Sequence, residues 1–569
     1  MKMQDFIFQS ISYTRPDHLL FEEELRRYIS TFNKSSTFDK QVKIILKIKK
    51  LRIEFETPLE IAWVRYSMNT NDVFYKREKE FIDNFLPEYD NLMNEFFNAL
   101  LKSPFRKELI SRFGERIFII AETSINRISP QISREQQEEN KLKSRYNQVL
   151  ASCSVLFRGK KRNFSELSSF ESSNNRQTRQ RASELKFGFL AKNQDTLDSI
   201  FDEMVQLRHI MSQKMGLNNY VELGYLYRNR SDYTPKDVEK LREEVLNHIT
   251  PLVTKLMEDQ SKRLNIDSLY YYDESCRFPN GNAKLIGDSN EIFKNLQTMF
   301  SELSSDTDEF FKNMIKHKMM DIENRDGKEV GAYCSCIPEY DSPFIFTNFN
   351  GTDDDIRVFI HEAGHAFQIY SAGRQEFIEY IWPTFDAGEI PSMAMEFFTW
   401  SWMELFFGRD ADKYRYAHFV KSLVFLPYGC AIDEFQHRVY ENPTLTSKER
   451  HYVWREIEKK YLPFRDYDSF PYLEMGGYWQ KQWHIYKTPF YYIDYVIAQT
   501  CAFQFWQNSQ INFDDAWNNY LRLCKTGGRY TFKHLLNIAN LDSPFKPGVI
   551  KSIIKTAESY LKNIDTDNL

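Results

Sequence analysis

Two histidines and a glutamate stand close enough in the sequence to hold a metal ion and a water molecule. His361, Glu362 and His365 form the pattern His-Glu-x-x-His. On a helix, side chains four residues apart project from one face, so both imidazoles can reach one ion, and the carboxylate between them can hold a water molecule on it. The alternative is a helix face with two solvated or core-capping histidines, because this short pattern also arises by chance in long chains.

Two downstream carboxylates can complete and support such a site. Glu389 lies 24 residues after His365, which leaves room for one helix to end and for a loop to return. Glu396 is seven residues further on, two turns along the same helix face, where it can accept the free ring N–H of a ligating histidine. We therefore expect one Zn²⁺ per chain, held by His361, His365 and Glu389, with a fourth position left for water, as is typical of catalytic zinc sites.

The elements that position these residues are predicted from the local pattern. Thr352 and the three aspartates after it favour the start of a helix that carries the metal motif. Residues 331–351 before it indicate a β-hairpin, and an extended peptide can add to the exposed edge of such a strand. Gly331, Ala332 and Tyr333 are therefore candidate substrate-binding residues. The alternative is a hairpin that only packs under the metal helix.

Composition predicts a helical protein and excludes several partners. Only 20 Gly and 19 Pro occur in 569 residues, which favours long helices, and this length is too great for one compact core. With 75 Lys plus Arg against 80 Asp plus Glu, the net charge of −5 makes no case for nucleic acid or an anionic membrane. The seven cysteines are few and odd in number, and no long apolar run or signal peptide is evident, so we expect a cytoplasmic protein without a membrane span.

The chain is expected to divide into two domains. The sequence between residues 159 and 182 is polar and basic, the weakest stretch for a packed core, so we place a boundary near residue 185. We predict a mainly α fold in which residues 1–185 form a helical N-terminal domain. Residues 186–569 would form a helical catalytic domain with the small β-hairpin next to the metal helix.

Together these motifs resemble peptidase family M3, the thimet oligopeptidase and oligoendopeptidase F group of zinc metallopeptidases. The likeness to the bacterial oligoendopeptidase F branch is dense over residues 331–400 and 475–506. It is carried by the metal motif and by the following segments: Glu389-Ile390-Pro391-Ser392, Gly331-Ala332-Tyr333-Cys334, Ser342-Pro343-Phe344-Ile345-Phe346, Asn348-Phe349-Asn350-Gly351, His484-Ile485-Tyr486 and residues 489–495.

The resemblance implies further features of the site. The two parts of the chain would enclose a deep channel that contains the zinc ion and admits short unfolded peptides. In this family a histidine and two tyrosines three residues apart line the cleft opposite the zinc, which matches His484, Tyr492 and Tyr495, although the histidine-to-tyrosine spacing is one residue shorter than in the thimet branch. Tyr491 adds a substrate contact. The alternative is a buried aromatic helix whose hydroxyls are satisfied.

The prediction from the sequence is therefore a zinc-dependent endopeptidase that hydrolyses internal bonds of short unfolded oligopeptides. Glu362 would act as the general base, while His484, Tyr492 and Tyr495 would stabilise the oxyanion. One alternative is a zinc exopeptidase of the carboxypeptidase or dipeptidyl type with a similar site. The other is a non-catalytic peptide-binding protein that keeps zinc for structure, which is disfavoured because Glu362 is present and no fourth protein ligand is evident. The oligomeric state stays open.

Overall fold

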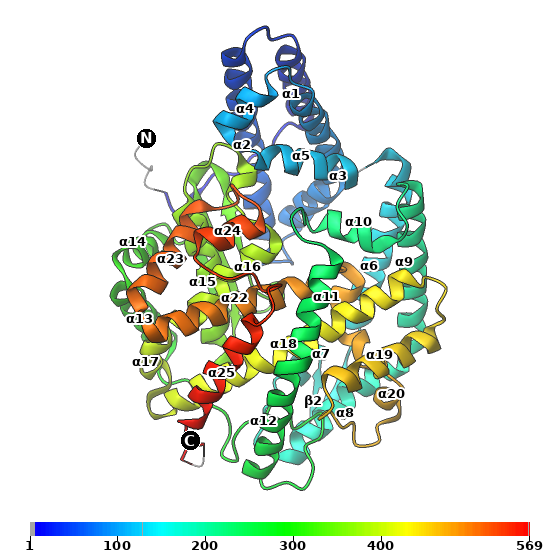
Figure 1. Ribbon diagram of the computed structural model, residues 1–569, viewed down its shortest axis with the longest axis vertical. Coiled ribbons are helices and arrows are strands. Elements are labelled where there is room, and N and C mark those ends of the chain that lie inside the picture. Colours follow the sequence, from blue (N-terminus) through cyan, green and yellow to red (C-terminus); the bar gives the residue numbers. More distant parts are fainter. Residues whose placement is uncertain (1–5, 128, 567) are drawn as a thin grey trace. The chain divides into compact units, whose positions relative to one another are not determined.

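The computed structural model describes residues 6–127, 129–566 and 568–569 (Figure 1). Helices dominate, and the described strands form one two-stranded and one three-stranded sheet, so the predicted mainly α fold is confirmed. Contacts divide the chain into two compact units, each built from three stretches. Unit 1 comprises Met1–Ile128, Leu285–Gly408 and Cys501–Asp542, and unit 2 comprises Ser129–Lys284, Arg409–Thr500 and Ser543–Leu569.

Unit 1 holds the predicted metal motif and the larger sheet. Its helices are α1 (His18–Asn33), α2 (Phe38–Met68), α3 (Val73–Leu101), α4 (Arg106–Phe113), α5 (Arg116–Arg127), α13 (Ser289–Leu303), α14 (Ser305–Lys316), α15 (Asp353–Ala372), α16 (Phe385–Phe398), α17 (Glu404–Phe407), α23 (Phe513–Thr526) and α24 (Phe532–Ile538). Its strands are β3 (Met320–Glu323), β4 (Tyr333–Ile337) and β5 (Ser342–Phe349).

Unit 2 is almost entirely helical. Its helices are α6 (Ser133–Ala151), α7 (Phe164–Ser168), α8 (Arg176–Lys192), α9 (Gln194–Lys214), α10 (Tyr220–Tyr227), α11 (Pro235–Glu244), α12 (Thr250–Arg263), α18 (Ala411–Glu441), α19 (Ser447–Tyr461), α20 (Pro471–Glu474), α21 (Trp483–Lys487) and α25 (Val549–Lys562). Its strands are β1 (Val155–Phe157) and β2 (Lys160–Arg162), while α22 (Tyr492–Ile511) begins in unit 2 and ends in unit 1. Over the described residues, every helix is too short or too polar to cross a bilayer.

The predicted domain boundary near residue 185 lies inside α8, within unit 2. The two contact-defined units are discontinuous in sequence, so they divide the chain in a different way. The division into residues 1–185 and 186–569 stays a prediction.

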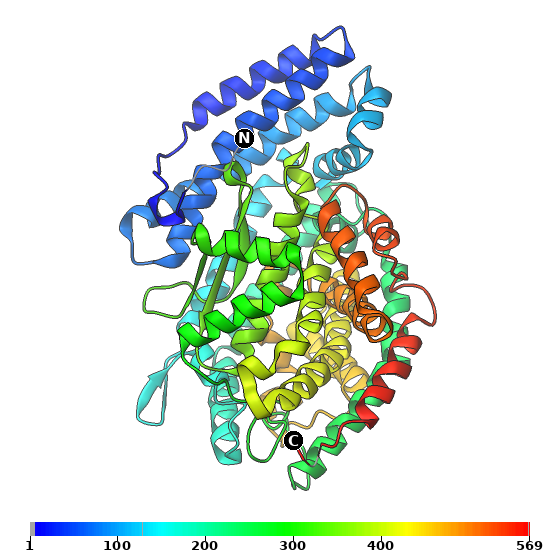
Figure 2. The same ribbon diagram turned by 90° about the vertical axis from the view of Figure 1, so that its left-hand side faces the viewer.

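The helical N-terminal region is built around an aromatic core. Helices α1 to α3 run side by side, as the blue ribbons of Figure 2 show. Asp17 and Asp72 cap α1 and α3, because each carboxylate accepts hydrogen bonds from N–H groups of the first turn. The buried rings of Phe21, Phe55 and Phe85 connect the three helices, with ring centroids 4.1 Å apart for Phe21–Phe55 and 5.4 Å for Phe55–Phe85.

The predicted β-hairpin is confirmed as β4 and β5, and a third strand joins it. The order is β3-β5-β4, with β4 antiparallel and β3 parallel to the central strand β5. The N–H of Ile345 on β5 donates to the carbonyl of Met319 at 3.0 Å, away from β4. Because antiparallel pairs alternate, Cys334, which faces Ile345, directs its own N–H and C=O toward the outer side of β4, and so does Cys336. The strand β4 is therefore an edge of the sheet.

Helix α15 starts where the sequence predicts. The hydroxyl of Thr352 and the carboxylate of Asp355 form a capping box, and Asp355 also accepts from the N–H groups of Asn350 and Gly351 at 2.9 and 2.6 Å. These hydrogen bonds connect the segment after β5 to the first turn of α15. They therefore fix the position of the helix relative to the hairpin.

Helices α15 and α16 approach each other closely at Gly364. A Cβ atom at this position would lie 2.6 Å from Cα of Ser392 and 2.7 Å from the carbonyl oxygen of Pro391, both in the backbone of α16. Backbone atoms cannot rotate away as a side chain can. Only glycine therefore permits this helix–helix separation.

We expect the substitution Gly364→Ala to lower the free energy of unfolding by about 2 kcal/mol or more, because α16 must shift to accept the methyl group. Thermal and denaturant unfolding would measure the loss. The matched control is Gly188→Ala on α8, where a Cβ meets no atom within 4 Å and where the expected change is less than about 1 kcal/mol. Equal stability of the two variants would contradict the close approach.

Candidate metal centre

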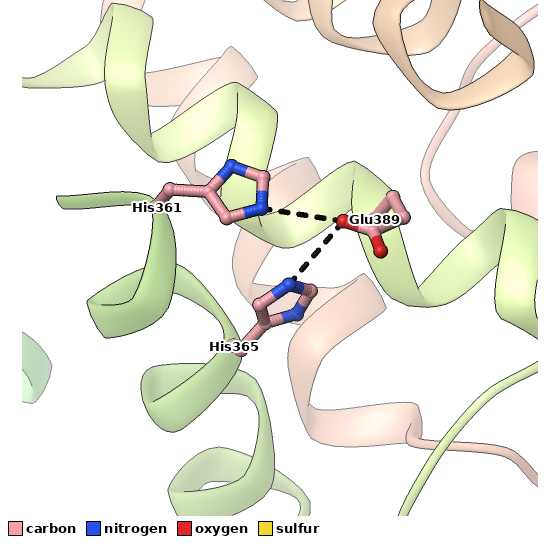
Figure 3. Close-up of side chains that lie close together, drawn as sticks. All are labelled: His361, His365 and Glu389. Carbon is pink, nitrogen blue, oxygen red and sulfur yellow. Dashed lines mark ion pairs between the residues drawn. The ribbon is translucent and has the colours of Figure 1, made fainter. Parts of the chain in front are cut away.

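The structure brings His361, His365 and Glu389 together. The Nε2 atoms of both histidines lie 3.3 Å from Oε2 of Glu389, as the dashed lines of Figure 3 mark. One potential ligand atom from each residue lies within 4.8 Å of the others, and the side chains of the histidines are only 15% and 12% exposed. Neither histidine is therefore a solvated surface residue, and three donors converge on one small volume.

Two helices supply these donors. His361 and His365 lie one turn apart on α15, with ring planes at 84° and ring centroids 5.0 Å apart. Glu389 lies on α16, a helix that is buried from Asp386 to Phe398. Gly364, which directly precedes His365, contacts the backbone of α16 at Pro391 and Ser392, so the close approach there sets the distance between the rings and the carboxylate of Glu389.

Glu396 contacts the other side of the His361 ring. The Nδ1–H of His361 donates to Oε1 of Glu396 at 2.8 Å, so the other ring nitrogen, Nε2, is the one that faces Glu389. Such a carboxylate fixes the tautomer and the orientation of a metal-binding imidazole. Glu389 is itself held by the hydroxyl of Ser392, which donates to Oε2 at 3.3 Å.

Burial and close charges change the acidity of the cluster. Burial alone lowers the pKa of His361, but its hydrogen bonds to Glu389 and Glu396 and their charges raise the pKa to about 10. Burial alone raises the pKa of Glu389, but the charge of His365 and the hydrogen bonds from both histidines hold it well below its usual value. Burial raises the pKa of Glu362, although the two histidines oppose the shift.

The chemistry of this donor set fits a divalent metal ion. Two imidazole nitrogens and one carboxylate oxygen are the ligands that zinc binds in catalytic sites with three protein ligands. Glu362, which is 7% exposed, directly follows His361 on α15. His361, His365 and Glu389 could therefore hold a metal ion. The carboxylate of Glu362 would then lie beside the ion without being one of these three ligands.

The hairpin residues predicted to contact substrate lie at and before the edge strand. Gly331 is exposed and has a φ of 112°, a conformation that favours glycine. Ala332 follows it, and Tyr333 opens β4 with its ring stacked on Phe346 at 4.7 Å. On the same strand, burial raises the pKa of Cys334 and the negative charge of Glu362 raises it further. Strand β4 also contacts α15, the helix that carries Glu362.

The late aromatic residues form a group of their own in unit 2. His484 lies on α21, Tyr491 directly precedes α22, and Tyr492 and Tyr495 lie on α22. The ring of His484 is 4.9 Å from Tyr492 and 6.0 Å from Tyr495, and Tyr491 is 5.0 Å from Tyr495. Burial raises the pKa of Tyr492, so its hydroxyl stays protonated and can donate.

A strained turn before α22 holds this group in place. Phe490 has a φ of 61°, a left-handed conformation rare for a bulky residue. Its N–H donates to Oε1 of Gln436 at 2.8 Å, and its C=O accepts from Nη2 of Arg230 at 2.6 Å. Arg230 also pairs with Asp494, and both side chains are 1% exposed. Gly224 faces the ring of Phe490, where a Cβ would lie 2.5 Å from Cδ2.

Sequence reasoning missed the residues that hold this turn. Arg230, Gln436 and Asp494 come from separate parts of the chain, and no local motif connects them. Nothing in the local sequence around Gly224 indicates its role. Its role depends on contact with a residue 266 positions away.

Comparison with known proteins establishes the family. A profile described as Peptidase M3 N-terminal domain matches residues 8–128, and one described as Peptidase family M3 matches residues 169–553. The second match covers more than half of the chain, so the chain belongs to peptidase family M3. The family resemblance predicted from the motifs is thereby confirmed.

Individual relatives support the oligoendopeptidase F branch. The oligoendopeptidase F homolog of Borreliella burgdorferi is 24% identical over 390 residues, which are 65% of this chain and 62% of that protein. The chromosomal oligoendopeptidase F of Lactococcus lactis subsp. cremoris is 24% identical over 342 residues, 58% of this chain and 54% of that protein. The chain thus matches less than two thirds of the length of these curated relatives.

A solved structure covers the chain almost completely. The structure of Pz peptidase A with an inhibitor is 45% identical, covers 99% of this chain and 100% of its own, and superposes with a TM-score of 0.94. The mainly α architecture described above is therefore the architecture of this relative.

We expect the substitution Glu396→Ala to weaken metal binding about 10- to 100-fold, because His361 loses the acceptor that orients its ring. Competition with a chromophoric chelator would measure the affinity for Zn²⁺. The control is Glu302→Ala, which removes an exposed carboxylate that accepts from the indole of Trp402. Unchanged metal affinity in Glu396→Ala would show that the hydrogen bond does not support the cluster.

Proposed function

We propose that this chain is a zinc-dependent endopeptidase that cleaves internal bonds of short, unfolded oligopeptides. The observation that carries the proposal is the convergence of His361, His365 and Glu389 beside Glu362 in a member of peptidase family M3. The three converging residues would hold one Zn²⁺ per chain. All seven cysteines are free, which supports a reducing, cytoplasmic location.

Glu362 has the position and environment of a general base. When bound, zinc supplies a Lewis acid that makes water a stronger nucleophile and polarises the scissile carbonyl. The carboxylate of Glu362 accepts the proton that the attacking water loses and returns it to the nitrogen of the leaving amine. Burial raises the pKa of Glu362, which brings its basicity nearer to neutral pH. Glu396 keeps the ring of His361 in the tautomer that ligation requires.

The edge of β4 offers a binding surface for the substrate backbone. The N–H and C=O groups of Cys334 and Cys336 point to the outer side of the strand. Gly331 and Ala332 precede the strand and Tyr333 begins it, and in our proposal these three residues contact the substrate. An extended peptide that pairs there would be held by main-chain hydrogen bonds whatever its sequence. Since β4 contacts the helix that carries Glu362, a peptide bound along this edge would run near the base.

The group in unit 2 supplies neutral hydrogen-bond donors. In our proposal His484, Tyr492 and Tyr495 stabilise the negative charge that develops on the carbonyl oxygen, and Tyr491 contacts the substrate. Donors fixed before reaction stabilise such a charge because no reorganisation is needed during the step. The strained turn at Phe490 supports this role, because hydrogen bonds to both the N–H and the C=O of this residue fix the start of α22.

The zinc-loaded protein should cleave an internally quenched peptide, and Glu362→Gln should lower kcat about 10²- to 10⁴-fold while zinc content stays the same, because the base is lost and the ligands are kept. A chelator should abolish activity and added zinc should restore it. Glu302→Gln serves as a control for loss of an exposed carboxylate.

Mass spectrometry of the products separates the alternatives. Internal fragments support an endopeptidase, whereas residues trimmed from one end would indicate an exopeptidase. Full activity in Glu362→Gln would exclude the mechanism. Tight peptide binding without turnover by the zinc-loaded protein would instead indicate a peptide-binding protein.

The substitution Gly224→Ala should lower kcat about tenfold or more, because a Cβ would push the ring of Phe490 and displace the tyrosines that follow it. The ring cannot move freely, since Tyr225, His437 and Tyr440 surround it. Steady-state kinetics, zinc content and thermal unfolding would be measured together, with Gly188→Ala as the control. A variant with native kcat would show that the turn does not position the donors.

A further inference from the structure

Two large aromatic side chains are exposed on the segment that joins the helices of the metal cluster. Trp382 is 37% exposed and lies between α15 and α16, and Phe385, the first residue of α16, is 42% exposed. Scattered exposed apolar residues need no explanation, but neighbouring ones at a functional site often mark a binding surface. Residues 381–385 contain no ionisable side chain.

Both residues flank the metal cluster. The ring centroid of Trp382 lies 6.0 Å from that of His365, with an angle of 57° between the planes. Phe385 is four residues before Glu389 on α16, so the two side chains lie one turn apart on the same side of the helix. Trp382 therefore contacts a histidine of the cluster, and Phe385 lies one helical turn before the residue that supplies its carboxylate.

The segment that carries Trp382 is held by its backbone. The N–H of Gly528 donates to the carbonyl of Tyr380 at 2.8 Å, and Nε2 of Gln368 on α15 donates to the carbonyl of Ile381 at 3.0 Å. A Cβ at Gly528 would lie 2.1 Å from the carbonyl oxygen of Trp382, so the two backbones are in direct contact. An aromatic side chain on a fixed backbone loses little entropy on binding, which favours affinity.

We propose that Trp382 and Phe385 form an apolar subsite that binds an aromatic or bulky aliphatic side chain of the substrate next to the scissile bond. This inference rests on the proposed peptidase function. Trp382 is partly exposed and its ring contacts His365, so a peptide whose scissile carbonyl lies at the cluster would bring a neighbouring side chain near this ring. The subsite would discriminate by burial of apolar surface, and charged or small polar side chains would gain nothing from it.

The test is a binding experiment that needs no turnover. Zinc-loaded protein with Glu362→Gln is titrated with two capped heptapeptides of glycine and serine, one with a central Phe and one with a central Ser. Isothermal titration calorimetry measures the affinity of each variant, and tryptophan fluorescence is followed in parallel. We expect the Phe peptide to bind about tenfold more tightly. Adding Trp382→Ala should remove this preference, and Trp382→Phe should restore most of it while the fluorescence change is lost.

Controls separate a subsite from simple packing on His365. Trp402→Phe, which changes an indole that bonds to Glu302, should leave the preference and the fluorescence change intact. Equal binding of the two peptides by the zinc-loaded Glu362→Gln protein would contradict the proposed subsite. So would a Trp382→Ala variant that loses zinc and weakens both peptides equally. Absence of hydrolysis by the wild-type protein would refute only the peptidase function, because the preference is measured by binding.

Discussion

The contact between the backbones of α15 and α16 at Gly364 determines whether a metal cluster can exist in this chain. His361 and His365 belong to one helix and Glu389 to the other, and Nε2 and Oε2 meet at 3.3 Å only because no side chain separates the helices where they cross. Helix axes usually pack about 8–10 Å apart, a distance set by the residues at the crossing. A single missing Cβ thus sets the geometry of three side chains.

Around this crossing three buried carboxylates meet two imidazoles. Glu362, Glu389 and Glu396 are all buried around two imidazoles. Burying unpaired charge is costly, and a cluster of carboxylates is normally retained where a cation or a proton compensates it. Protonation of His361 meets part of this need, and a divalent ion would meet it more fully. The burial of these carboxylates and the donor geometry therefore both favour a cation at this crossing.

Unit 2 also contains a close contact that only a glycine permits, and there it positions aromatic side chains instead of a metal cluster. Gly224 lets the ring of Phe490 lie against α10, just as Gly364 lets α16 lie against α15. Phe490, which has a left-handed backbone conformation, is hydrogen-bonded through its N–H to Gln436 and through its C=O to Arg230. These bonds fix the backbone from which the following tyrosines extend. Strain of this kind persists only where surrounding contacts fix it, and it often occurs beside functional groups.

Local sequence was sufficient for several features of this protein. The spacing of His361 and His365 predicted a shared helix face, Thr352 and its aspartates predicted the start of α15, and the Pro-bounded segment predicted β4 and β5, because these signals depend only on neighbouring residues. Strand β3 was missed because its four residues carry too short a pattern. The position of Trp382, the bonds of Arg230 and the discontinuous units depend on residues far apart in the chain. Only the packed tertiary structure brings such residues together, because no local periodicity encodes contacts between distant segments.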